Sequence, residues 1–327
     1  MEIPPKYSIS QDLLSLIAKI EAERLYFSSL NLEDAVKENI QRVSLLKSSL
    51  FSARIEGNPL KISDFEVGET EEEKKKEIFN IVNAVKFIDK NIEKSFITKD
   101  HILHLHSLVL RNISPDAGRL RTEISAIFNE SGVAVYMPPP PTQVLTLLNK
   151  LLAYVNSKEK FPLIIAFAAH LVFEKIHPFL DGNGRVGRLL ISAILKSKGW
   201  DFSFTVPFEE YLDEHKDEYY FQLSNGLKNT NSYLEFMLSA FYKQIEKIRN
   251  QIAEELLKEN NPFLPPRQEE MLNIIKDQVI VSFDMIRRRF LQVPERTLRY
   301  DLKKLFDKKL IEKSGETRGR YYRVRMK

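Results

Sequence analysis

The segment from Phe161 to Ile176 constrains the fold most strongly, because it is apolar on almost every side of its expected helix. Such a helix has no polar face to turn toward water and is therefore buried within a larger helical body. A second helical pattern, Val186 to Lys198, stops before Gly199, where a left-handed C-terminal cap is expected. We therefore predict two adjacent core helices that hold the polar residues between them in a fixed place.

These polar residues, His177 to Arg188, read HPFLDGNGRVGR and combine a base, an acid, turn residues and two cations. The Gly182–Gly184 segment permits a tight turn whose backbone amides point into one concavity at the start of the next helix. Such a concavity binds phosphate. Arg185 and Arg188 are three positions apart and can face the same ligand, and their guanidinium groups suit phosphate oxygens. The loop is therefore a candidate phosphate site.

Two other loop residues each allow two interpretations. Asp181 beside a polyphosphate is a natural Mg2+ ligand, because this ion prefers one or two carboxylates plus phosphate oxygens. A lone aspartate in a loop is otherwise a turn residue. His177 has an ordinary pKa that suits it to take a proton from an attacking hydroxyl group. The alternative for His177 is a capping residue at the end of the preceding helix.

Most of the remaining chain is predicted to be helical, including residues 1–95 and 208–260. Between Ser125 and Met137, two short strand-like runs flank the turn signal Glu130-Ser131-Gly132, and Pro138–Pro141 follow as a stiff polyproline segment. We predict a small hairpin there. It is either a surface excursion from a helical body or an exposed edge to which an extended segment could add as a strand.

Asparagines and prolines between Asn260 and Pro266 interrupt the helical pattern and mark the clearest domain boundary. Beyond it, three short helical patterns precede two strand-like runs around a glycine-containing turn, which is the order of a winged helix-turn-helix. We therefore predict four regions: an N-terminal helical region (1–95), a helical core (96–245), a helical linker (246–261) and a winged helix domain (262–327).

Composition excludes several classes of protein. The 327 residues contain no cysteine, which excludes disulfides and thiolate metal sites and fits a reducing cytoplasm. The longest apolar run, Phe161 to Phe173, is interrupted by His170 and is too short to cross a membrane, and we recognise no signal peptide. Residues 262–327 carry a formal charge of +8, against −4 for the rest of the chain. We expect a cytoplasmic protein with a basic C-terminal domain.

Three histidines, His101, His104 and His106, lie on one predicted helix. Their spacing cannot place all three on the same face. We therefore interpret them as surface or helix-packing residues and not as a metal site.

The central loop resembles the signature of the Fic family, HPFx[DE]GNGRxxR, at all nine fixed positions. Fic domains are helical and carry a hairpin flap, and most transfer AMP from ATP to a protein Ser, Thr or Tyr hydroxyl, releasing pyrophosphate. The resemblance implies a protein adenylyltransferase that modifies other proteins and itself, with protein substrates docking on a flap at residues 123–137. It implies that His177 is the catalytic base, that Asp181 holds Mg2+, and that Gly182, Asn183, Gly184, Arg185 and Arg188 bind the ATP phosphates.

A second resemblance lies at Ser52–Asn58, SARIEGN, which is similar to the family's inhibitory motif, [ST]xxxE[GN]. Taken alone, Glu56 and Gly57 form an unremarkable helix end. Ser52 and Glu56 share a helix face, and the resemblance implies that Glu56 lies against Arg188, where the γ-phosphate of ATP belongs. Glu56 would then inhibit the transfer. In some relatives this glutamate also supports removal of AMP, so a de-AMPylating hydrolase stays an alternative.

The resemblance covers about residues 40–245 and leaves several points open. Tyr219 and Tyr220 fall in the region that commonly lines the nucleotide pocket, without a pattern that selects one of them. Fold-level analogy also admits transfer of a phosphate or phosphocholine group, although the intact Gly-Asn-Gly-Arg segment favours the ordinary orientation of ATP.

The basic C-terminal domain allows two functions. Its helix-turn-helix motif, together with the wing formed by the two strand-like runs, would present a positive surface to DNA phosphates. The chain would then be a DNA-binding regulator whose Fic domain senses nucleotide. The alternative is a module for protein docking or for homodimerisation, because Glu295 and Asp301 dilute the charge. The residues of the predicted positive surface are Arg296, Thr297, Arg299, Lys303, Arg318, Arg320 and Arg323.

Overall fold

The computed structural model describes residues 1–30, 32, 34–65, 72–92, 96–128, 134–158, 161–260, 264–278, 280–314 and 321–324. The protein is mainly helical, which confirms the predicted fold class. It divides into two compact units, Met1–Arg249 and Asn250–Lys327, and the division falls within one long helix. No described helix is long and apolar enough to cross a membrane.

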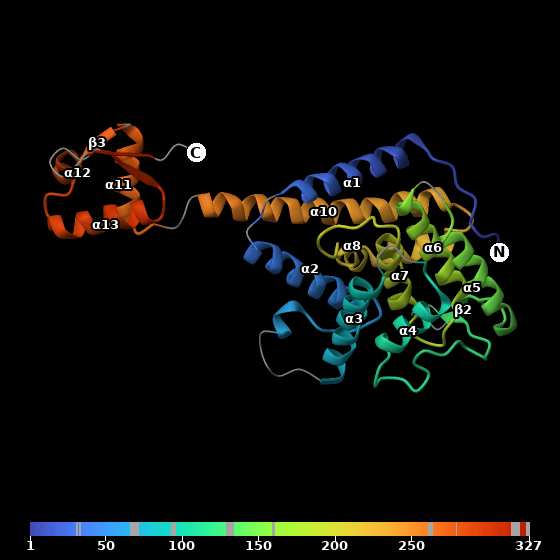
Figure 1. The fold of residues 1–327 in the computed structure, drawn as a ribbon. Helices are drawn as coiled ribbons and strands as arrows, with labels where there is room; N and C mark the ends of the chain where they lie inside the picture. Colours follow the sequence, from blue (N-terminus) through green and yellow to red (C-terminus); the bar gives the residue numbers. More distant parts are fainter. Residues whose placement is uncertain are drawn as a thin grey trace. The chain divides into compact units, whose positions relative to one another are not determined.

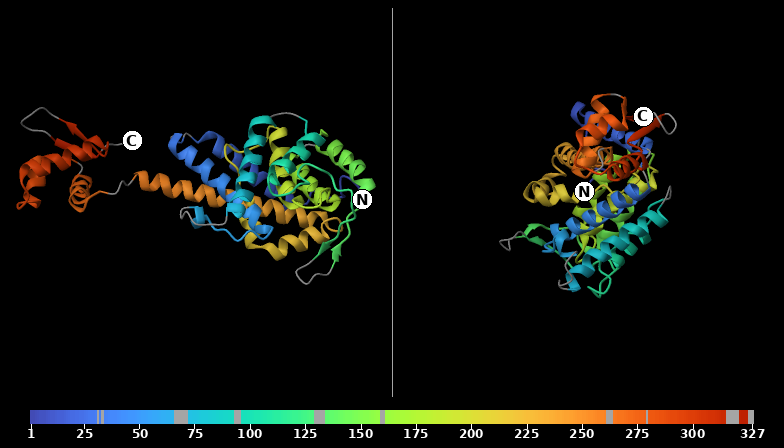
Figure 2. Two further views of the ribbon diagram at one scale, coloured as in Figure 1. Left: turned by 90° about the horizontal axis from the view of Figure 1, so that it is seen from below. Right: turned by 90° about the vertical axis from the view of Figure 1, so that its left-hand side faces the viewer.

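The first unit is a helical body with a small hairpin at its surface (Figures 1 and 2). Its elements are α1 (Gln11–Ser29), α2 (Asp34–Ile55), the 3-10 helix η1 (Ile62–Phe65), α3 (Glu72–Asn91), α4 (Lys99–Val109), β1 (Ile127–Phe128), β2 (Ala134–Tyr136), α5 (Pro141–Val155), α6 (Pro162–Ile176), α7 (Asn183–Ser197), α8 (Phe208–Glu214), α9 (Lys216–Asn225) and α10 (Thr230–Asn260) as far as Arg249.

Helix α6 forms the centre of this unit, as its apolar sequence predicted. Nearly all of its residues are buried, and it packs against α5 and α7. Burying each large aliphatic or aromatic side chain contributes about 1.5–3 kcal/mol. Helix α7 ends at Ser197, and Gly199 has a φ of 62°, which confirms the predicted left-handed cap. The two helices thus fix both ends of the polar loop between them.

Three further helices, α2, α3 and α4, pack against α7 (Figure 1). Asn80 on α3 donates hydrogen bonds to the carbonyl groups of Val109 (3.1 Å) and Arg111 (2.9 Å), which joins α3 to the end of α4. Because α2 also packs on α3, the N-terminal region and the core form one body. Side chains from α2, α3 and α4 can therefore reach the start of α7.

The predicted hairpin is present as strands β1 and β2, which pair in antiparallel fashion. Its predicted turn, Glu130–Gly132, lies outside the described residues. Helix α5 begins at Pro141, so the last residue of the predicted stiff segment is the first residue of a helix. Proline is favoured at this position because its missing N–H has no intrahelical role.

Helix α1 runs beside α10 (Figures 1 and 2). Ser10 donates to Glu235 (2.9 Å) near one end of the pair, and Glu23 forms an ion pair with Arg249 further along. Ser10 also caps α1 by accepting a hydrogen bond from the backbone N–H of Leu13. These contacts hold α1 against α10, although the two helices lie far apart along the chain.

The second unit has its own buried core of apolar residues. Its strands form an antiparallel sheet in the order β3-β5-β4. The sequence predicted three helices and two strands, but not β3, whose three residues are too few to give a strand pattern. The elements after α10 are α11 (Pro266–Asp277), β3 (Ile280–Ser282), α12 (Phe283–Arg289), α13 (Glu295–Asp307), β4 (Ile311–Ser314) and β5 (Tyr321–Val324).

Candidate active site

The loop between α6 and α7 has a strained backbone at its first residue. His177 is the C-cap of α6 and has φ 49° and ψ 62°, in the left-handed region. Gly182, with a φ of 77°, is the N-cap of α7. The backbone N–H groups in the first turn of a helix lack intrahelical partners and form the positive end of the helix dipole. The start of α7 therefore offers donors suited to phosphate.

Asn183 closes the loop on itself. Its side-chain amide donates to the carbonyl group of Phe179 and accepts from the N–H of Phe179, both at 2.9 Å. The Phe179 ring is completely buried and anchors the loop in the core. Asn183 thus shapes the turn through its side chain, which leaves its backbone N–H as the group that could face a ligand.

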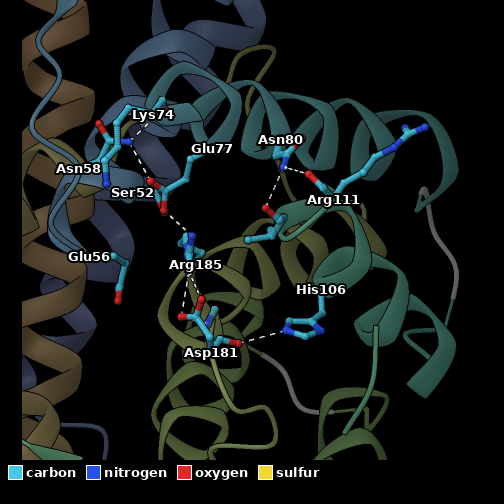
Figure 3. Close-up of polar contacts among 12 residues, drawn as sticks. Ser52, Glu56, Asn58, Lys74, Glu77, Asn80, His106, Arg111, Asp181 and Arg185 are labelled. Atoms are coloured by element: carbon cyan, nitrogen blue, oxygen red, sulfur yellow. Dashed lines mark hydrogen bonds and ion pairs between the residues drawn. The ribbon is translucent and has the colours of Figure 1, made fainter. Parts of the chain in front are cut away.

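His106 on α4 supports the loop from the other side. Its ring stacks on that of Phe179, with centroids 3.7 Å apart and an angle of 5° between the planes. Nδ1 accepts the N–H of Gly118 (2.8 Å), which leaves Nε2 to donate to the carbonyl group of Asp181 (3.1 Å; Figure 3). Burial lowers the pKa of His106. The predicted packing role therefore extends to holding the loop at Asp181.

The imidazole of His177 is neutral at pH 7. Burial and the nearby Arg121 lower its pKa from the ordinary 6.5 to about 4, while the carbonyl group of Glu174 acts in the opposite direction. Nδ1 is buried without a hydrogen-bond partner of normal geometry among the described residues. A neutral imidazole has a free lone pair, so His177 is chemically able to accept a proton.

Arg188 lies almost wholly buried against the end of α2. Its Nε donates to Ser52 Oγ (3.0 Å), and one terminal nitrogen donates both to the Ser52 carbonyl oxygen (2.8 Å) and to Glu56 Oε1 (2.9 Å). A side chain at Gly184 would clash with the Glu56 carboxylate. Glycine at this position is therefore what lets Glu56 approach the loop. The structure thus brings Ser52, Glu56 and Arg188 together.

Arg185 is also paired with carboxylates. It contacts Glu77 on α3, and its other terminal nitrogen lies 3.0 and 3.1 Å from the two carboxylate oxygens of Asp181 (Figure 3). Asn58, three residues after the end of α2, donates to Glu77 (2.8 Å) and to the carbonyl group of Lys74 (3.0 Å). The two loop arginines therefore each meet an acid from the N-terminal region, although they point to different helices.

Asp181 has the donor chemistry of a Mg2+ ligand. Its side chain is 63% exposed, so it can leave Arg185 for an ion at the surface. The described residues contain no group of three or more histidines and acids that could hold a metal ion. One accessible carboxylate is nevertheless sufficient when a substrate supplies phosphate oxygens and water completes the shell. The residues present therefore fit a Mg2+ ion that arrives with a nucleotide.

The two tyrosines of α9 have different surroundings. Tyr219 is buried, and its hydroxyl lies 3.2 Å from Nε2 of His170. Tyr220 is 44% exposed and donates to the carbonyl group of Ile55 (3.3 Å), the last residue of α2. The ring of Tyr220 can therefore contact a ligand beside Glu56, whereas that of Tyr219 belongs to the core.

A family profile described as Fic/DOC family matches residues 96–195. Curated relatives include a protein adenylyltransferase Fic from Aedes aegypti, 27% identical over 217 residues, which are 62% of this chain and 41% of the relative. Another, from Drosophila mojavensis, is 33% identical over 129 residues, which are 38% of this chain and 24% of the relative. The chain thus spans about two fifths, or less, of the curated relatives it matches.

Solved structures share the fold. A Fic family protein from Desulfovibrio desulfuricans superposes with a TM-score of 0.69 at 21% identity, over 99% of this chain and 98% of the other. Fic-1 from C. elegans (residues 134–508) gives a TM-score of 0.62 at 22% identity, over 74% and 73% of the two chains. The match to the Desulfovibrio protein extends over both units.

Proposed function

Residues 96–195 form a domain of the Fic/DOC family, and from this premise we propose that the protein transfers AMP from ATP to a Ser, Thr or Tyr hydroxyl of a protein, including itself. The observation that carries the proposal is the arrangement at the start of α7. The twelve residues His177–Arg188 include a neutral histidine, two arginines and the backbone amides at the start of α7. The curated relatives are named protein adenylyltransferases, which supports the transfer of an adenylyl group to protein.

In this reaction, His177 takes the proton of the attacking hydroxyl group. A proton on Nδ1, directed at the Glu174 carbonyl group, would leave Nε2 as the acceptor. The hydroxyl oxygen forms a bond to the α-phosphorus as the bond from that phosphorus to the bridging oxygen breaks, and pyrophosphate leaves with the bond electrons. Mg2+ held by Asp181 would offset the negative charge of the phosphates. The loop residues orient the α-phosphate for in-line attack.

Two groups of donors would bind the phosphates. The backbone amides at the start of α7 suit one phosphate group, and Arg185 and Arg188 can reach others. Both guanidinium groups pair with carboxylates. ATP must therefore displace these acids before its phosphates can occupy the loop. The exposed Tyr220 is our candidate for contact with the adenine base, because its ring lies near the end of α2.

We propose that Glu56 inhibits the transfer by occupying Arg188. The contact at 2.9 Å supports this proposal, because Arg188 cannot give the same donor fully to a γ-phosphate. Ser52 strengthens the arrangement by fixing the guanidinium through two hydrogen bonds. The alternative function is removal of AMP from a modified protein. In that reaction water would attack the phosphorus in place of a protein hydroxyl group, and the same residues would take part.

Protein substrates are proposed to dock on the flap at residues 123–137, of which 129–133 lie outside the described residues. Strand β2 pairs with β1 on one edge. An extended segment of the target could add to a free edge and bring its hydroxyl group to His177. Two residues beside the strands, Ile124 and Met137, are 74% and 61% exposed and offer apolar contacts to such a segment.

The transfer rate is expected to stay nearly constant as the pH falls from 8 to about 5.5, because the pKa of His177 is lowered to about 4. The proton-accepting form is the neutral one, which is lost only below that pKa. Initial rates of self-labelling by a Glu56→Gly variant, at saturating MgATP, would test this. Circular dichroism at each pH checks that the protein stays folded. A half-maximal rate near 6.5 would indicate an ordinary, exposed histidine.

The second unit has the element order of a winged helix, and DNA binding is its candidate function. Arg296 and Lys303 are exposed on α13. Several neighbouring cations are engaged within the unit, since Arg287 and Arg299 pair with Glu295 and Arg323 pairs with Glu312. Arg318 and Arg320, in the predicted wing, lie outside the described residues. The charge available to DNA is therefore smaller than the sequence suggests.

If this unit binds DNA, the full chain should bind a random-sequence duplex at low salt and release it as salt rises. A plot of log affinity against log salt has a negative slope, and each lost phosphate contact makes this slope less steep by about 0.9. Changing both Arg296 and Lys303 to glutamine should remove about two such contacts. The same change at the exposed Lys90 and Lys228 of the first unit is the control. Absence of binding at low salt would favour the docking function instead.

A further inference from the structure

Arg121 connects the flap, residues 123–137, to the loop between α6 and α7. It lies between α4 and β1 and is 3% exposed. Its Nε donates to the carbonyl group of His177 (2.7 Å), and its terminal nitrogens donate to those of Glu123 (3.0 Å), Ile176 (3.4 Å) and Pro139. All of these acceptors are main-chain groups. The guanidinium therefore holds the chain at four points and pairs with no acid in these contacts.

The four acceptors belong to two segments, the hairpin and the end of α6, whose relative positions the proposed reaction depends on. Glu123 and Pro139 lie on either side of the hairpin, whereas Ile176 and His177 end α6 and begin the catalytic loop. The backbone N–H of Arg121 also donates to the carbonyl group of Pro178 (3.0 Å). Arg121 thus fixes both ends of the hairpin to the residue that we propose as the base.

A second contact supports the same connection. The hydroxyl group of Tyr136 on β2 donates to the carbonyl group of Lys175 (2.9 Å), and the ammonium group of Lys175 lies 4.4 Å from the centre of the Tyr136 ring. Lys175 is two residues before His177. The second strand of the hairpin is therefore also tied to the end of α6, but at a point that does not involve the His177 backbone.

The backbone of His177 needs support from its surroundings. Its left-handed conformation costs about 1–3 kcal/mol in a residue with a side chain. A charge-assisted hydrogen bond to its carbonyl group is among the stronger contacts available to the loop. Because Arg121 Nε makes this bond, it helps to maintain the conformation that aims the imidazole.

We infer that Arg121 is a positioning residue of the transfer reaction, which sets the strand that receives the target at a fixed distance from the imidazole of His177. The inference rests on the function proposed above and concerns residues outside the loop signature. Arginine suits this position because its planar group directs five N–H donors in fixed directions, whereas lysine has one compact ammonium group.

The positive charge of Arg121 also provides a readout that a purely structural role would not change. After burial, Arg121 is the next largest influence that lowers the pKa of His177. Among the described residues, the other groups that act on this imidazole are Glu56, Asp181 and the Glu174 carbonyl group, and all three raise its pKa. Removing the charge of Arg121 should therefore move the acid limb of the rate profile to higher pH, whereas lysine should leave it in place.

The test compares Arg121→Gln and Arg121→Lys in the Glu56→Gly variant, with self-labelling from α-phosphate-labelled ATP as the probe. Displacing a reacting group by about 1 Å can cost about 100-fold in rate. We expect both variants to label about 10- to 100-fold more slowly, with ATP affinity in calorimetry unchanged. Only the glutamine variant should shift the acid limb upward. Arg119→Gln, at an exposed site two residues away, is the control and should match the parent.

A glutamine variant that melts like its parent, binds ATP, and labels at the parent rate with the parent pH profile would overturn the inference. If that variant does not fold, the lysine variant decides, because parent-like labelling by folded Arg121→Lys would also overturn it. If neither variant folds, Tyr136→Phe decides. This change removes the hydrogen bond from Tyr136 to the Lys175 carbonyl group, so labelling should slow. An unchanged labelling rate would overturn the inference. An inactive Glu56→Gly parent would instead refute the proposed function, which separates the two failures.

Discussion

Replacing His177 by alanine is expected to lower the rate of AMP transfer about 10²- to 10⁴-fold, the usual contribution of a general base. The imidazole is neutral at pH 7 because its pKa is lowered to about 4, so most molecules hold it ready to accept a proton. Its removal should leave ATP affinity nearly unchanged, since the proposed phosphate donors lie on α7. The rate of protein labelling and the ATP dissociation constant, measured on the same sample, would separate these effects.

The control for this variant is His104→Ala, which removes an exposed imidazole from α4. It should label like the parent. Loss of ATP binding in the His177 variant would show that the loop had collapsed, and the rate would then say nothing about proton transfer. An unchanged labelling rate with normal ATP binding would contradict the assignment of His177 as the base.

Replacing Glu56 by glycine is expected to raise the rate of transfer about 10- to 150-fold. A hydrogen bond between charged groups contributes about 1.5–3 kcal/mol, and this change removes one such bond from Arg188. The freed guanidinium can then bind the γ-phosphate. Initial rates of labelling at fixed ATP concentration, together with ATP affinity, give the comparison.

Glu56→Gln is the matched variant, because it keeps the shape of the side chain and removes its charge. We expect a rate between those of the wild type and Glu56→Gly, since an amide oxygen accepts from Arg188 more weakly than a carboxylate. Ser52→Ala should have a smaller effect on rate, because the Ser52 carbonyl group would still hold the guanidinium. Equal rates for all four proteins would indicate that Glu56 is an ordinary helix-end residue.

The sequence predicted the parts of the molecule that depend on local pattern. The apolar α6, the cap at Gly199 and the hairpin follow from residues that are neighbours in the chain. The loop from His177 to Arg188 could be interpreted because its residues lie within twelve positions. Its resemblance to a family then connected Glu56 to Arg188, which are 132 positions apart.

The supporting residues could not be predicted in this way. Glu77 is 108 positions from Arg185, and His106 is 75 positions from Asp181. Each occupies an ordinary place in a helical pattern, and only the packing of α3 and α4 on α7 brings it to the site. Arg121 has no periodic neighbours that mark it as buried, and its partners are carbonyl groups that sequence does not distinguish.

Labelling with ATP that carries its radioactive label on either the α- or the γ-phosphate tests the proposed reaction most directly. The Glu56→Gly protein should become labelled from α-labelled ATP, with release of pyrophosphate, and should take up no label from γ-labelled ATP. Mass spectrometry should find one AMP on a Ser, Thr or Tyr side chain, and the additional change His177→Ala should abolish it. Label from the γ-phosphate, or labelling that survives the loss of His177, would contradict AMP transfer by this loop.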